Sequence, residues 1–214
     1  RTARQIDRAQ PDLTPGEKYL RTLEHLGSGS LISDVSQYTL NNLQKSYAQL
    51  DQGTVEQIVD ILLRSDRKYI AGFRGTACCA QYMASKLLFL TPHVVPILHA
   101  DATAVENLLD ITERDCLFLY SFPRYSEIAR PLMEIARESG AKVILMTDRR
   151  TSPLANKADV VVTAQVDGLG FTNSYVAPLS LSEVILLSVS GRKDVTDSKR
   201  FNRIDSVMER EKLY

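Results

Sequence analysis

Apolar residues follow two different periodicities along this chain, and the change between them falls near residue 66. Before that point, apolar positions recur every three or four residues, which is typical of helices with one buried face. From Lys68 onward, short apolar runs rich in β-branched residues alternate with stretches of helical period. The pattern therefore predicts an N-terminal helical segment followed by an α/β domain.

The first helix has a recognisable start. Thr14 and Glu17 have the spacing of a capping box, and Pro15 takes the first helical position, where its missing amide proton costs nothing. The Gly/Ser run at 27–30 is predicted to separate this helix from the next one.

A long second helix and a third helix are expected before the α/β domain. One face of the second helix carries a row of residues at helical spacing, namely Ile32, Val35, Thr39, Leu43, Tyr47 and Leu50. Gly53 is expected to end this helix, and Thr54 with Gln57 has the pattern of a second capping box that begins the third.

Five short apolar runs predict five strands, at 68–72, 94–98, 115–120, 142–146 and 159–163. Helical stretches alternate with them, at 76–90, about 102–111, 126–139 and 174–190. Strands alternating with helices indicate a parallel sheet covered on both faces, a three-layer αβα fold. Five such strands are expected in the flavodoxin-like order 2-1-3-4-5. A charged helix with a thin apolar stripe is predicted at 197–214, where packing on its own domain and a dimer contact fit equally well.

Charge and composition restrict the partners. The chain has 214 residues, with 26 Lys+Arg and 26 Asp+Glu, so its net charge is zero. A balanced chain gives no electrostatic reason to expect nucleic acid or an anionic membrane as its direct partner. No apolar run approaches the length of a membrane span, and no signal peptide is apparent. The chain begins with Arg, so we expect that an upstream region has been removed.

Three cysteines, Cys78, Cys79 and Cys116, are an odd number without metal-ligand spacing. This argues against a disulfide framework or a zinc site. We expect buried, reduced residues of a cytosolic protein, with a redox role for the adjacent pair as the alternative. No metal or cofactor is expected.

The predicted strand order places a ligand site between the first and third strands, where the order reverses. The turn after the first strand is GFRGTA, in which Gly72 and Gly75 allow a tight turn and close approach to a bound group. Thr76 supplies a hydroxyl that can also cap the next helix, and Arg74 supplies a planar positive charge. The alternative is a plain strand-to-helix turn.

The turn after the third strand, YSFPRYSE, is more informative. Ser121 ends the strand, and Ser126 is predicted to open the next helix, whose free amides and dipole favour an anion. Arg124 adds charge-assisted bonds suited to phosphate, and Ser121 suits a sugar hydroxyl. The alternative is that Ser126 only caps the helix while Arg124 points to water. Two hydroxyls and an arginine at this point favour a site for a small phosphorylated molecule.

A third loop, 147–159, is long for a link between parallel strands. Ser152 begins a turn into a short helical piece, and we include it among the predicted ligand-binding residues. For Asp148, Arg149 and Arg150, ligand contact is an alternative, although a solvated loop is the expected place for the two arginines.

Several segments together resemble the sugar isomerase (SIS) domain, and more narrowly the effector domain of RpiR-type bacterial transcription regulators. They are GFRGTA, YSFPRYS, GAKVILMTD, TSPLANKAD and SYVAPLSLSEVILLSV, and the resemblance covers about 67–195. The general SIS pattern has Ser-x-Ser-Gly-x-Thr in the second turn. Ser121 and Ser126 keep its first and last hydroxyls, while Pro123 and Arg124 replace the middle Ser and Gly, as is usual in the regulators. In the first turn Thr76 stands for the usual Ser and Arg74 for the second Gly.

The resemblance implies a division into a helical linker or oligomerisation segment (1–66), an SIS domain (67–195) and a C-terminal helix (196–214). Family members sense phosphorylated sugars or related metabolites and form dimers or higher oligomers. We therefore expect a non-catalytic domain that binds a phosphorylated sugar or sugar acid and forms a homodimer or tetramer. It would reach DNA only through a helix-turn-helix head, which residues 1–66 do not resemble.

Two other functions stay open at this point. A phosphosugar isomerase or lyase of the same fold needs a general base, and the candidates are Glu183, Glu127, Glu106 and His99. A purely structural oligomerisation module is the third possibility, against which the hydroxyl-rich turns argue.

Overall fold

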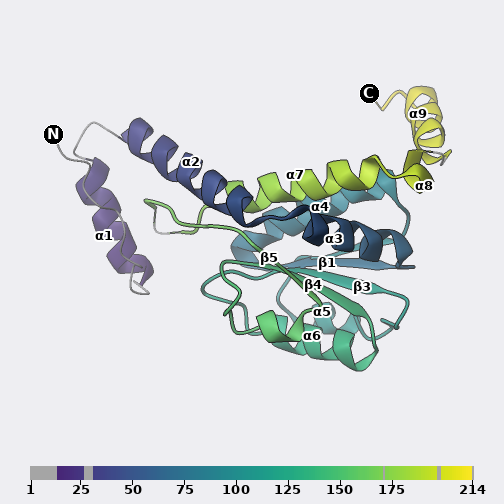
Figure 1. The fold of residues 1–214 in the computed structure, drawn as a ribbon, viewed down its shortest axis with the longest axis horizontal. Coiled ribbons are helices and arrows are strands. Elements are labelled where there is room, and N and C mark those ends of the chain that lie inside the picture. The colour runs from purple at the N-terminus through teal and green to yellow at the C-terminus, as the bar shows by residue number, and fades with distance from the viewer. Residues whose placement is uncertain (1–13, 27–30, 171, 197–198, 214) are drawn as a thin grey trace.

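The computed structural model describes residues 14–26, 31–170, 172–196 and 199–213, and a five-stranded parallel sheet forms its centre (Figure 1). The strands are β1 (Lys68–Gly72), β2 (Val94–Ile97), β3 (Cys116–Tyr120), β4 (Lys142–Thr147) and β5 (Val160–Thr163). Their order is β2-β1-β3-β4-β5, which confirms the predicted fold class. Gly72 lies opposite Tyr120 in the register, so β1 and β3 end level at the carboxyl edge.

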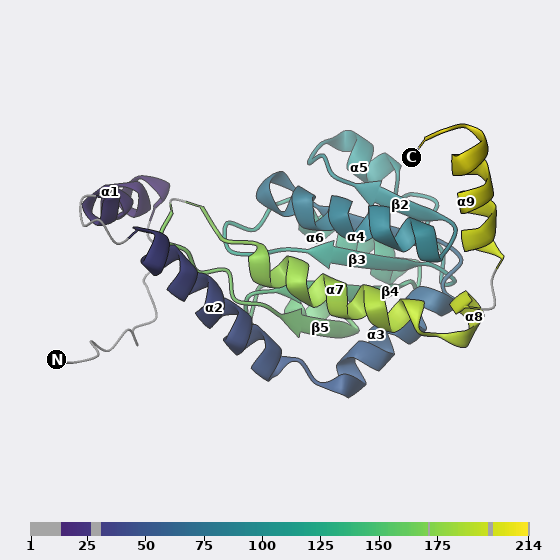
Figure 2. The same ribbon diagram turned by 90° about the horizontal axis from the view of Figure 1, so that it is seen from above.

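Helices cover both faces of the sheet, as expected for a parallel arrangement. One layer consists of α3 (Gln52–Arg64), α4 (Ala77–Leu90) and α7 (Val176–Ser190), and the other of α5 (Ala102–Glu106) and α6 (Ala129–Glu138). Outside these layers are α1 (Pro15–Leu26), α2 (Leu31–Gln49), α8 (Lys193–Thr196) and α9 (Arg200–Arg210). Figures 1 and 2 show α2 running beside α7, with α1 beyond the sheet at one end and α9 at the other.

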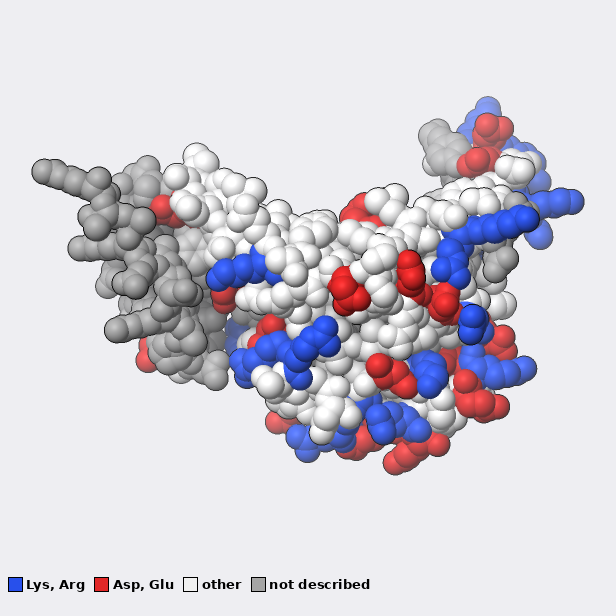
Figure 3. Space-filling view, in the orientation of Figure 1, with Lys and Arg blue, Asp and Glu red and all other residues white. Residues whose placement is uncertain are grey.

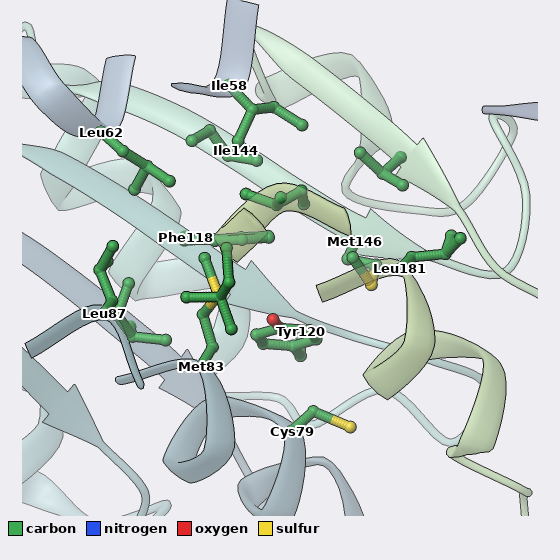
Figure 4. Close-up of a cluster of buried hydrophobic side chains, with 14 of the residues drawn as sticks. Ile58, Leu62, Cys79, Met83, Leu87, Phe118, Tyr120, Ile144, Met146 and Leu181 are labelled. Atoms are coloured by element: carbon green, nitrogen blue, oxygen red, sulfur yellow. The ribbon is translucent and has the colours of Figure 1, made fainter. Parts of the chain in front are cut away.

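Two apolar clusters, one on each face, hold the layers together. Figure 4 shows part of the first, where Ile58 and Leu62 of α3 approach β3 and β4 from one side and Met83 of α4 approaches from another. Phe118 stacks on Tyr120 with ring centroids 4.9 Å apart, and the buried Tyr120 hydroxyl pairs with the Ser182 hydroxyl at 2.7 Å. The polar hydroxyl of Tyr120, at the carboxyl end of β3, is therefore hydrogen-bonded although it is buried.

The two predicted helix starts in the N-terminal segment have different outcomes. The first capping box is confirmed, because the Thr14 amide donates to Glu17 Oε2 at 2.7 Å and the Glu17 amide donates to Thr14 Oγ1 at 3.3 Å. The second is wrong, because Asp51 caps α3 by accepting from the Thr54 amide at 2.8 Å. Gly53 therefore lies inside α3 instead of ending the helix before it.

Other boundaries also differ from the prediction. The helix expected at about 102–111 ends at Glu106 and continues as turns. Of the helix predicted at 197–214, α9 forms over Arg200–Arg210, and the short helix α8 precedes the predicted range. α9 packs beside α4, where the Arg200 guanidinium donates twice to Leu88 O, at 3.0 and 2.6 Å. The Gly/Ser break predicted at 27–30 lies outside the described residues, as do 197–198 and 214.

The long helix α2 forms as predicted, but its inward face is polar. Ser46 and Asn42 are 0% and 2% exposed, whereas Ile32 is 88% exposed. The expected apolar face is therefore only partly buried: Leu43 and Leu50 are half-buried, and Leu50 packs against the core. The two fully buried positions instead form hydrogen bonds with a neighbouring loop.

The surface agrees with a balanced charge. On the face in Figure 3, the part over α2 and α7 is largely uncharged, while Lys, Arg, Asp and Glu intermingle over the lower part. In the described ranges, no helix is both long and apolar enough to cross a membrane.

Asp115, just before β3, closes the amino edge of the sheet. Its carboxylate accepts from the Arg67 amide at 2.9 Å and from the Thr112 amide and hydroxyl at 2.8 and 2.9 Å, and the residue is 3% exposed. These bonds join the start of β1 to the start of β3.

Asp115→Ala should therefore lower the free energy of unfolding by about 2–3 kcal/mol, because Arg67 and Thr112 lose a buried, charged acceptor that takes three hydrogen bonds. The measurement is urea denaturation followed by circular dichroism. Asp110→Ala, at an exposed site five residues earlier, should change it by about 0.5 kcal/mol or less. Equal effects of the two substitutions would contradict the role given to Asp115.

Candidate functional site

A cavity of about 330 Å³ opens at the carboxyl ends of β1 and β3, where the predicted site was expected. Its walls come from the turn after β1, the turn after β3 and the loop before α7. The lining residues are Phe73, Arg74, Gly75, Thr76, Tyr120, Ser121, Phe122, Pro123, Arg124, Ser126, Thr172, Asn173 and Tyr175. The structure thus brings six of the eight predicted ligand-binding residues to one cavity.

Two glycines make the first turn compact. A Cβ on Gly72 would lie 2.5 Å from Thr76 O, and a Cβ on Gly75 would lie 2.7 Å from Tyr175 Cε2. Such distances are far inside normal contact, so a side chain at either position would displace its neighbour. Gly75 thereby lets the Tyr175 ring lie directly against the first turn, while Gly72 lies beneath the cavity and outside its lining.

Thr76 is used by the turn itself. Its hydroxyl accepts from the Phe73 amide at 2.8 Å and donates to Phe73 O at 2.9 Å. A hydroxyl has one proton, so Thr76 has none left for a ligand and offers at most a lone pair. Its ligand-binding role stays a prediction, whereas its role in closing the short helix Arg74–Thr76 is observed.

The second turn differs from the prediction in one respect. α6 begins at Ala129, three residues after Ser126, so Ser126 does not open that helix. Instead Ser126 O accepts from the Ala129 amide at 3.1 Å, and the Ser126 residue lines the cavity. Within the described chain, the amides of Ser126 and Glu127 donate no hydrogen bond. The free donors expected here are therefore present, although the helix starts later.

Arg74 and Arg124 both have left-handed backbone conformations, with φ of 57° and 69°. These are the positions at which the general SIS pattern has glycine, and a side chain there costs about 1–2 kcal/mol. Neither guanidinium forms an ion pair or hydrogen bond with any described residue. Strain kept at a cavity wall, with two unpaired positive charges, is typical of a binding site.

Ser121 is a buried polar residue of the cavity lining. The residue is 5% exposed, and its Oγ has no hydrogen-bond partner among the described residues. Its amide donates to Met146 O at 3.0 Å, which fixes the backbone as an extension of β3. A buried hydroxyl without a partner is costly, so Ser121 stays a candidate for bonding a polar group of a ligand.

The third wall was missed by the sequence prediction. Thr172, Asn173 and Tyr175 come from the loop 164–175, and Asn173 Nδ2 donates to Pro123 O at 3.2 Å. Burial raises the pKa of Tyr175, with smaller opposing effects from Asn173 and Arg124, so its hydroxyl stays protonated at neutral pH. No local pattern in this polar loop indicates that it turns back over the cavity.

Several candidates lie elsewhere. Ser152 is buried with an unpartnered Oγ, but it is outside the cavity lining. The four candidate bases, His99, Glu106, Glu127 and Glu183, are exposed and also outside it. In the third loop, Asp148 accepts from the Tyr125 hydroxyl at 2.7 Å and pairs with Arg149 at 3.3 Å.

The cysteines are free thiols. Cys79 and Cys116 are buried, and burial raises the pKa of Cys116 to about 11, which keeps it protonated. Cys78 is exposed, contrary to expectation, and its Sγ donates to Gly75 O at 3.1 Å. The described residues contain no His, Cys, Asp and Glu cluster that could hold a metal ion.

A parallel sheet with this strand order and a donor-rich cavity at the point of reversal defines a small-molecule-binding α/β domain. The family profile of the SIS domain matches residues 61–188, which is more than half of the chain. The chain therefore belongs to the SIS domain family. No curated protein has a sequence significantly similar to this chain.

Solved structures share the fold. The sugar isomerase domain of an RpiR transcription factor from Sphaerobacter thermophilus is 22% identical, with a TM-score of 0.78 over 85% of this chain and 99% of that one. The Vibrio vulnificus NanR protein complexed with ManNAc-6P is 16% identical, with a TM-score of 0.71 over 87% and 71%. A putative sugar-phosphate isomerase from Listeria monocytogenes is 15% identical, with a TM-score of 0.68 over 81% and 93%.

The left-handed backbone at Arg124 predicts that glycine is more stable there than alanine, by about 1 kcal/mol, because only the Cβ is strained. Thermal unfolding of Arg124→Gly and Arg124→Ala gives the difference. The matched pair is Lys45→Gly and Lys45→Ala, on the exposed side of α2. There the alanine variant should be the more stable one, by about 1 kcal/mol, because glycine is unfavourable inside a helix. Alanine equal to or better than glycine at 124 would show that no strain is stored in this turn.

Proposed function

We propose that this chain is a ligand-sensing SIS domain that binds a phosphorylated sugar, or a related sugar acid, in the cavity between β1 and β3. The observation that carries the proposal is the convergence of Arg74, Arg124 and the orphan Ser121 hydroxyl on one cavity. The phosphate would lie near Arg124 and the free amides of Ser126 and Glu127, and a sugar hydroxyl would bond to Ser121.

The chemistry of the lining supports this ligand class. Hydrogen-bond donors are frequent in it, including two guanidiniums, the Ser126 hydroxyl and the Asn173 amide, while Tyr175 and Phe122 add aromatic surface. The volume of about 330 Å³ is at the small end of ligand sites. The NanR structure holds ManNAc-6P, a ligand of the same class.

The regulator role rests on the resemblance to RpiR-type effector domains and on the similarity of fold to the Sphaerobacter and Vibrio proteins. In this proposal, ligand binding changes the geometry of a homodimer or tetramer and of the DNA-binding heads attached to it. Exposed apolar side chains on α1 and α2, among them Leu20, Ile32 and Leu40, support an oligomer.

A phosphosugar isomerase is the second candidate, supported by the similarity to the putative Listeria enzyme. Isomerisation needs a general base within reach of the substrate. The lining offers no carboxylate or imidazole among the described residues, and the four candidate bases lie outside it. The positions of these groups favour binding over catalysis by a single chain.

The test is thermal unfolding with a panel that includes ManNAc-6P, fructose 6-phosphate, the matching free sugars and sugar acids. At a concentration near 100 times its dissociation constant, a binding compound should raise the melting temperature by roughly 5–10 °C. Arg124→Ala should weaken its affinity about 10- to 100-fold, because a charge-assisted bond to phosphate is lost.

The matched control is Arg150→Ala, which removes the same charge from a residue outside the lining and should leave the affinity unchanged. No shift of the wild type by any compound would refute the ligand class. Turnover of a bound sugar phosphate, followed by NMR, would instead favour the isomerase.

A further inference from the structure

The loop 164–175 connects two parts of the molecule that are far apart in sequence. Its second half supplies Thr172, Asn173 and Tyr175 to the cavity. Its first half runs beside α2 toward α1, as both Figure 1 and Figure 2 show. The loop therefore has one side at the predicted ligand site and the other at the N-terminal helices.

The first half of the loop is held by the polar face of α2. Three bonds follow one another at alternate residues of the extended chain, and on the helix they fall at positions 49, 46 and 42, which share one face. The bonds are Thr163 Oγ1 to Gln49 Oε1 at 2.6 Å, the Gln165 amide to Ser46 Oγ at 2.8 Å, and Asn42 Nδ2 to Asp167 O at 2.6 Å.

This arrangement explains why α2 buries polar side chains. Beyond β5 the chain has no neighbouring strand on this side, so its backbone needs other partners. Asn42 and Ser46 supply them, and Ser46 Oγ also donates to Asn42 O at 2.6 Å. On α1, the Thr22 hydroxyl extends the row by donating to Leu169 O.

One backbone bond joins the two halves of the loop. The Ser174 amide donates to Val166 O at 3.0 Å, and Val166 lies between the two residues that α2 holds. Ser174 in turn lies between Asn173 and Tyr175, which line the cavity. The residues that α2 holds are therefore connected to the cavity wall through a single backbone hydrogen bond, from Ser174 to Val166.

We propose that Asn42 and Ser46 are positioning residues for the cavity, so that the placement of α2 and the occupancy of the cavity influence each other. Neither residue lines the cavity, so both would act through their hydrogen bonds to the backbone of Gln165 and Asp167. This coupling rests on the proposed function, because it matters only if the cavity binds a ligand. A coupling between two sites is reciprocal, so a ligand that fixes Asn173 also favours the bonded position of α2.

The first test needs no ligand. Hydrogen exchange measured by mass spectrometry should show peptides covering 164–175 exchanging about five- to tenfold faster in Asn42→Ala and in Ser46→Ala, because the bonds that hold the loop are lost. Peptides from β3 should be unchanged, which excludes general destabilisation. The two substitutions remove different bonds to the loop, so the test survives if one of them prevents folding.

Tyr47→Phe is the matched control. It removes a hydrogen bond from the same helix, 2.8 Å to Ser180 Oγ of α7, without touching the loop. Exchange at 164–175 should stay at the wild-type rate. Unchanged exchange in Asn42→Ala and Ser46→Ala, or equal acceleration in Tyr47→Phe, would overturn the positioning role.

The second test uses ManNAc-6P as the probe. Its affinity should fall about five- to tenfold in Asn42→Ala, although no residue of the lining has changed, and should stay the same in Tyr47→Phe. Equal affinity in Asn42→Ala and the wild type would overturn the coupling. If no sugar phosphate binds the wild type while the exchange result holds, the proposed function fails and the positioning role stands.

Discussion

The reversal of strand order between β1 and β3 is the constraint on which the site depends. Because β1 leads to α4 on one face and β3 leads to α6 on the other, their two following turns separate and leave a crevice between them. The aligned ends at Gly72 and Tyr120 bring both turns to one level. Every polar group assigned to the cavity is placed by this geometry, directly or through the loop 164–175.

The turns around the cavity retain unfavourable local structure. Two arginines occupy left-handed backbone positions, and the buried Ser121 hydroxyl has no partner among the described residues. The well-packed sheet beneath, with Phe118 and Tyr120 fully buried, supplies the stability that these features reduce. A ligand with an anionic group and a hydroxyl would satisfy both kinds of unmet interaction at once.

The strands and their order were predictable because β-branched apolar runs alternate with helical periods over the whole domain. Helix starts were less predictable: Asp51 and Thr54 both suit a helix cap by composition, and in the structure Asp51 takes the cap by accepting from the Thr54 amide and hydroxyl. The turns that supply Arg74, Ser121 and Arg124 could be found because they follow strands directly. The wall formed by Thr172, Asn173 and Tyr175 could not be predicted. The position of its loop depends on hydrogen bonds to α2, which is distant in sequence, and no local pattern encodes such bonds.

A crystal structure of the chain with a phosphorylated sugar that stabilises it would test the proposed site most directly. We expect phosphate oxygens within hydrogen-bond distance of the Ser126 amide and of the Arg124 guanidinium, and a sugar hydroxyl bonded to Ser121 Oγ. A sugar phosphate bound elsewhere, with Ser121 and both arginines still without a partner, would contradict it.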